Sequence, residues 1–129
     1  MTREEHKYLQ KWLDKAEEDF IVVQQLMSSE FPIRGAIAYH CQQSVEKFLK
    51  AFMVFNRLEI PRTHNIEFLL EQCAKIDPGF LIIDPGNLTD YGVELRYSSD
   101  FLEPSAMELE IMISVVKEIK EVTLGKVKL

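Results

Sequence analysis

Large apolar residues recur at steps of three and four along most of this chain of 129 residues. Such spacing puts them on one face of an α-helix and differs from the alternation of a half-buried strand. A first helix is predicted over about residues 4–28, with the stripe Leu9, Trp12, Leu13, Ala16, Phe20, Val23 and Met27. A second is predicted from about Pro32 to Asn56, with the stripe Ile37, Cys41, Val45, Phe48 and Phe52. Because its other faces are also apolar, we expect this second helix to be central, or to face both the core and a second subunit.

Three shorter helical patterns follow, over about residues 66–76, 87–97 and 104–123. His64 or Asn65 could cap the first of them, and Pro104 suits the first turn of the last. Between them, residues 77–86 contain two Pro-Gly dipeptides and cannot be regular helix throughout. No segment shows the alternation of a strand. The sequence therefore predicts one all-α domain over residues 1–129, an up-and-down bundle of four to five helices.

The charge distribution indicates where an anion could bind. A net charge of −6 disfavours general binding to nucleic-acid backbones, so we expect no binding to the DNA backbone. Residues 33–64 nevertheless carry +3, because two acidic residues there are outnumbered by Arg34, Lys47, Lys50, Arg57 and Arg62. An anionic ligand is expected at this segment.

Other sequence features bear on location and cofactors. The charged N-terminus does not resemble a signal peptide, and no apolar run is long enough to span a membrane, so we expect a cytoplasmic protein without a membrane association. Cys41 and Cys73 lie in helical apolar patterns without metal-site spacing, which favours buried free thiols over a disulfide or a zinc site. We expect no metal and no cofactor.

Polar side chains form a strip on the second predicted helix. At about 100° per residue, His40, Gln43, Lys47 and Lys50 fall within a sector of about 80°, with Glu46 beside it. This second-helix strip could bind a phosphate or a base edge. It could equally be an exposed face, or a dimer seam in which these groups bond one another.

Two further places could contact a nucleotide. In the loop after the second helix, Arg62 offers a planar fork for phosphate and His64 an acid, base or donor. The alternative is that Arg62 pairs with an acid and His64 caps the next helix. Farther on, Tyr91 and the pair Arg96–Tyr97 could stack on bases, or simply pack and pair locally.

Common enzyme signatures are absent from the sequence, including phosphate-binding glycine loops, nucleophile elbows and zinc-protease motifs. A nucleophile pair of Cys41 with His40 is disfavoured, because adjacent helical residues point about 100° apart.

Taken together, these motifs resemble the HEPN family (higher eukaryote and prokaryote nucleotide-binding domain) over nearly the whole chain. The opening W-x3-A-E-E-D is similar to Trp12, Ala16, Glu17, Glu18 and Asp19. A helix reading H-x-x-Q-x-x-E-K-x-x-K matches His40, Gln43, Glu46, Lys47 and Lys50. The P-R-T-H loop matches Pro61 to His64, and the late R-Y matches Arg96–Tyr97. The resemblance implies a helical bundle that usually dimerises, associates with nucleotides or RNA, and often works beside a separate small nucleotidyltransferase.

Many members of the HEPN family are metal-independent ribonucleases that act as toxins, and the resemblance implies an Arg followed four to six residues later by His. Arg96 is in the expected place, but Phe101 and Leu102 stand where the imidazole belongs, and no histidine follows. The incomplete motif argues against ribonuclease activity, because imidazole is the group best suited to move the proton of the attacking hydroxyl.

The leading hypothesis is therefore a non-catalytic, homodimeric module that binds a nucleotide or RNA and acts with a nucleotidyltransferase, in a toxin–antitoxin-like pair. Phosphate would meet Lys47, Lys50 and Arg62, while Gln43 and Tyr97 would contact the base or sugar. One rival hypothesis is a ribonuclease that uses Arg96 with His64 or His40. Another is a protein that only dimerises or binds partners.

Overall fold

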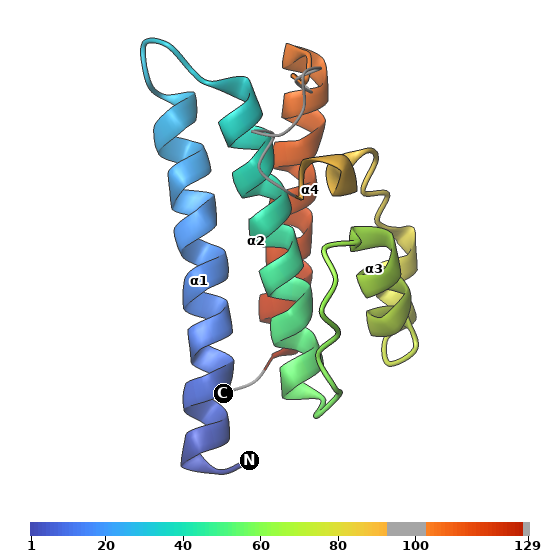
Figure 1. The fold of residues 1–129 in the computed structure, drawn as a ribbon. Coiled ribbons are helices and arrows are strands. Elements are labelled where there is room, and N and C mark those ends of the chain that lie inside the picture. The colour runs from blue at the N-terminus through green and yellow to red at the C-terminus, as the bar shows by residue number, and fades with distance from the viewer. Residues whose placement is uncertain (93–102, 128–129) are drawn as a thin grey trace.

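The computed structural model describes residues 1–92 and 103–127 (Figure 1). Four α-helices and two short 3₁₀ helices make up this part of the chain, and it contains no strand. In chain order the elements are α1 (Arg3–Met27), α2 (Arg34–Phe55), α3 (Ile66–Ala74), η1 (Pro78–Ile82), η2 (Leu88–Tyr91) and α4 (Ala106–Lys126). The predicted all-α bundle is confirmed.

Helix α2 is the central helix, as its apolar composition predicts. It packs against α1, α3, α4 and η2, and Figure 1 shows it between α1 on one side and α3 and α4 on the other. Helix α1 buries one stripe, which includes Leu9, Leu13 and Phe20, whereas α2 buries side chains around most of its circumference. An element enclosed in this way must also bury any polar residue that the sequence places on it.

Local capping explains where three helices begin. The Thr2 hydroxyl accepts a hydrogen bond from the backbone N–H of Glu5 at 3.0 Å, and the Asn65 side chain accepts one from Phe68 at 2.9 Å. Asn65, rather than His64, is therefore the cap of α3. Helix α4 begins with a capping box, in which Ser105 and Glu108 each bond the other's backbone N–H.

Several predicted boundaries are corrected by the structure. Pro32 and Pro104 precede their helices instead of lying in the first turn, because Ile33 and Ser105 occupy the cap positions. Helix α4 continues to Lys126, three residues beyond the predicted end. Helix α3 ends at Ala74, two residues early.

The helix predicted over residues 87–97 is, in its described part, a single 3₁₀ turn from Leu88 to Tyr91. Gly92 follows it and packs closely on other residues: a Cβ built there would lie 2.9 Å from Gln42 Nε2 and 3.1 Å from His64 Cβ. A continuing helix with a larger residue at this position would collide with α2 and the loop before α3. Residues 93–97 of the predicted helix lie outside the described residues.

Both cysteines are free and completely buried. Burial raises the pKa of Cys41 to about 12, and it raises the pKa of Cys73 to about 12 as well. Neither thiol is a nucleophile near neutral pH, because the thiolate is the reactive form. Within residues 1–92 and 103–127, no helix combines the length and apolarity needed to cross a membrane.

Candidate functional site

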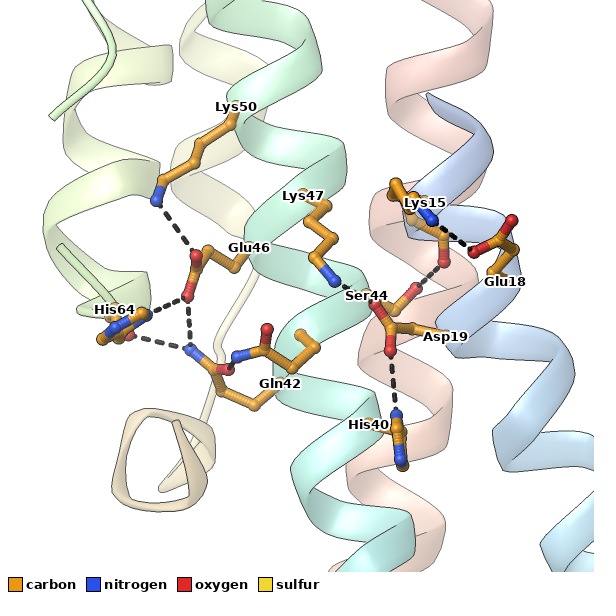
Figure 2. Close-up of polar contacts among 12 residues, drawn as sticks. Lys15, Glu18, Asp19, His40, Gln42, Ser44, Glu46, Lys47, Lys50 and His64 are labelled. Atoms are coloured by element: carbon orange, nitrogen blue, oxygen red, sulfur yellow. Dashed lines mark hydrogen bonds and ion pairs between the residues drawn. The ribbon is translucent and has the colours of Figure 1, made fainter. Parts of the chain in front are cut away.

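The first polar cluster joins α1 to α2 around Asp19, which is 9% exposed. Lys47 Nζ donates to Asp19 Oδ2 at 2.6 Å, and His40 Nδ1 lies 2.8 Å from Asp19 Oδ1 (Figure 2). Beside them, the Ser44 hydroxyl donates to the carbonyl oxygen of Ala16 at 2.9 Å. A buried carboxylate needs such partners, since losing its hydration would otherwise be costly. Lys47 and His40 therefore hold α1 against α2.

The second polar cluster surrounds Glu46, which is only 4% exposed. Lys50 Nζ donates to Glu46 Oε2 at 3.0 Å, and His64 Nδ1 lies 2.8 Å from Glu46 Oε1. The Gln42 amide donates both to Glu46 Oε1 at 3.1 Å and to the carbonyl oxygen of His64 at 2.9 Å. Figure 2 shows these groups on the side of α2 opposite Asp19. Glu46 and Gln42 therefore tie the loop before α3 to the central helix.

The side chains of the second-helix strip turn toward different partners. Lys47 and His40 turn toward Asp19 on α1, whereas Lys50 turns toward Glu46 and is itself 6% exposed. The predicted spacing of about 100° per residue placed these residues in one sector of the helix correctly. Because α2 is enclosed on several sides, however, each cation bonds the nearest carboxylate. Gln43 is half-buried and donates to Gln42 Oε1 at 2.7 Å. Whether any of these residues binds a nucleotide stays a prediction.

Two residues of the loop before α3 remain accessible. Arg62 and His64 are exposed, the His64 side chain to 58%. Arg62 lines a hollow of about 590 Å³ between the end of α2, this loop and α3, where Met53, Phe68 and Gln72 form other parts of the wall. No ion pair joins Arg62 to another residue of the described part. Glu59 lines the same hollow without forming an ion pair with Arg62, so the alternative in which a neighbouring acid neutralises Arg62 gains no support.

His64 is held in a particular orientation by Glu46. A carboxylate that bonds one ring nitrogen of histidine fixes the orientation of the ring and leaves the second nitrogen free for another partner. Here Glu46 bonds Nδ1, so Nε2 is the nitrogen available to a ligand. This arrangement can donate a hydrogen bond to an anion, or accept and return a proton.

Sequence reasoning missed three residues that build these clusters. Asp19, Gln42 and Glu46 are not among the ligand-binding residues that the sequence predicts, although each holds other polar groups in place. Asp19 lies three residues after Ala16 and four before Val23, both in the buried stripe, and this spacing was a usable signal. Arg96 and Tyr97 lie outside the described residues, so their predicted part in ligand binding is unchanged.

Comparison with known proteins gives one match. The family model described as HEPN domain matches residues 9–127, nearly the whole chain. No curated protein and no solved structure matches the chain.

The burial of the Glu46–Lys50 pair leads to a test of stability. Lys50→Ala leaves a buried carboxylate short of a partner and should lower the free energy of unfolding by about 3 kcal/mol. Lys15→Ala is the matched control, because Lys15 pairs with Glu18 at 3.2 Å on the surface and should contribute less than about 1 kcal/mol. Urea denaturation followed by circular dichroism measures both. If both variants lost equally little free energy of unfolding, the burial of Glu46 would not require its ion pair with Lys50.

Proposed function

This chain belongs to the HEPN domain family, and from that premise we propose that it binds a nucleotide or RNA phosphate at the loop Pro61–His64. The observation that supports the proposal most directly is the contact between buried Glu46 and half-exposed His64. It fixes the loop beside the hollow that Arg62 lines. An exposed guanidinium and an oriented imidazole are both suited to a phosphate group.

In this proposal Lys47 and Lys50 stabilise the fold and do not contact the phosphate. Each already donates to a carboxylate, at 2.6 Å and 3.0 Å, and a ligand would have to replace those bonds. Arg62 has no such competitor among the residues that the structure describes. The phosphate contact expected of the two lysines is therefore assigned to Arg62 and His64.

Calorimetric titration with adenosine monophosphate tests this site. We expect saturable binding to the wild type, weakened about tenfold in Arg62→Ala through loss of a charged hydrogen bond. Arg57→Ala is the matched control, because Arg57 belongs to the same basic segment but pairs with Glu5 at 3.5 Å and lies outside the Arg62 hollow. No heat with the wild type, or equal weakening in both variants, would exclude the site.

We further propose that the module is a homodimer and works with a separate nucleotidyltransferase, as its resemblance to the family implies. Support for a subunit contact comes from α4, where Met107 and Ile111 lie one turn apart and are 72% and 54% exposed. Apolar side chains that expose this much surface are often covered in an assembly.

Light scattering should therefore give about twice the chain mass of 15.0 kDa. Met107→Glu combined with Ile111→Glu should yield monomers, because burying carboxylates in an apolar contact is unfavourable. Leu81→Glu combined with Ile82→Glu is the control, since these two apolar residues are 67% and 85% exposed but lie on η1. A monomeric wild type, or dimers in both double variants, would refute the contact at α4.

A second candidate function is metal-independent RNA cleavage, and the orientation of His64 favours it. With Nδ1 bound to Glu46, the free Nε2 could take the proton of a 2′-hydroxyl while the hydroxyl oxygen attacks the adjacent phosphorus. The bond from phosphorus to the 5′-oxygen of the next nucleotide would then break, leaving a 2′,3′-cyclic phosphate, and the 5′-oxygen would take a proton from water. His64 would supply the imidazole that the sequence lacks after Arg96.

Incubation of the purified protein with RNA in EDTA tests this candidate. Cleavage should fall about 100-fold or more in His64→Ala, which removes the general base, and Arg96→Ala should also lower it. His6→Ala is the control, because His6 lies at the start of α1. Intact RNA with the wild type would leave phosphate binding as the better account.

A further inference from the structure

A small hollow lies between α1 and α2, and Lys50 Nζ lies 5.9 Å from the ring centroid of Trp12 in its wall. The hollow measures about 210 Å³ and is lined by Tyr8, Lys11, Trp12 and Lys15 of α1 and Lys47 of α2. The rings of Tyr8 and Trp12 meet edge to face with their centroids 6.3 Å apart. The walls present only apolar atoms, so the lysines contribute their methylene stems and their ammonium groups lie outside.

A second hollow adjoins the first, because Tyr8 lines both. It measures about 320 Å³, and its walls combine Val54, Leu58 and Ile60 with the ion pair of Arg57 and Glu5. Together the two hollows form a groove along the first half of α1, which we call the Trp12 groove. Two neighbouring hollows suit successive side chains of an extended or helical peptide, and the first, which is wholly apolar, suits an apolar one.

The rim of the first hollow is cationic. Lys15 forms an ion pair with Glu18, and Lys47 forms one with Asp19, as Figure 2 shows. Lys11 is exposed, and within the described residues no ion pair joins it to an acid. A local excess of positive charge on a chain with a net charge of −6 favours an acidic partner.

The size and chemistry of the first hollow indicate what it takes up. Pockets for small molecules usually measure about 300–1,000 Å³, so 210 Å³ fits one side chain better than a whole nucleotide. A nucleobase has hydrogen-bond donors and acceptors on its edge, and the walls of this hollow contain no polar atoms to bond them. Burying the base there would therefore cost the free energy of desolvating those groups. An apolar side chain has no such cost.

We propose that the Trp12 groove is a docking surface for an acidic segment of a partner protein, with one large apolar side chain in the hollow of Tyr8 and Trp12. The acidic residues beside that anchor bind Lys11, while Lys15 and Lys47 line the hollow with their methylene stems. Burial of the anchor provides affinity, and Lys11 selects the charge of the segment.

The fluorescence of Trp12 reports on this surface directly, because the chain has one tryptophan. The probe is the blocked peptide Asp-Glu-Phe-Asp-Glu, and its counterpart with Ala in place of Phe tests the anchor. We expect a saturable change with the first peptide and none with the second. Lys11→Glu should raise the apparent Kd about fivefold, and added salt should weaken binding.

Lys7→Glu is the matched control: Lys7 lies one turn before Lys11 on α1 but outside the lining of both hollows. The proposal is overturned if the phenylalanine peptide leaves the fluorescence unchanged, or if Lys7→Glu weakens binding as much as Lys11→Glu. It is also overturned if adenosine monophosphate changes the fluorescence and the peptide does not, since a nucleotide would then be the occupant. Arg62→Ala should keep the full peptide response, so this result is independent of phosphate binding at the loop.

Discussion

The burial of Glu46 is the interaction on which the candidate site depends. A carboxylate that is 4% exposed must be compensated, and three groups do so: Lys50 one turn along the helix, Gln42 one turn before it, and His64 from the loop. The loop is held twice, because the ring of His64 contacts Glu46 and the carbonyl oxygen of His64 accepts a hydrogen bond from Gln42. A requirement of folding thereby sets the orientation of a residue that is open to ligands.

The fold could be predicted almost entirely from spacing, because a helix that buries one face repeats its apolar residues every three or four positions. The boundaries of α1 and α2 differ from the predicted ones by only one or two residues. The exception is the pattern at residues 87–97, where Leu88 and Tyr91 are buried as expected but on a 3₁₀ turn that ends at Gly92. Periodicity over four residues does not distinguish that turn from the start of an α-helix.

The candidate site was predictable only in part, because a helical wheel gives directions and not partners. The wheel correctly placed Lys47 and Lys50 in one sector. It could not show that Lys47 bonds Asp19 of α1 whereas Lys50 bonds Glu46 of α2. The nearest opposite charge decides whether a lysine is available to a ligand, and Asp19 is 28 positions away in the sequence from Lys47. By contrast, Arg62 and His64 were identified from the loop itself, where fewer elements can pack over a side chain.

Binding and catalysis at His64 make different demands on the loop before α3. For phosphate binding, the exposed guanidinium of Arg62 and the oriented ring of His64 need only face the same anion. For general-base catalysis, Nε2 must also lie beside the attacking hydroxyl while another group holds the phosphate. Glu46 orients the ring for either role through its contact with Nδ1 at 2.8 Å. Binding therefore requires less of the residues that the structure describes, and the absence of a histidine after Arg96 in the sequence points the same way.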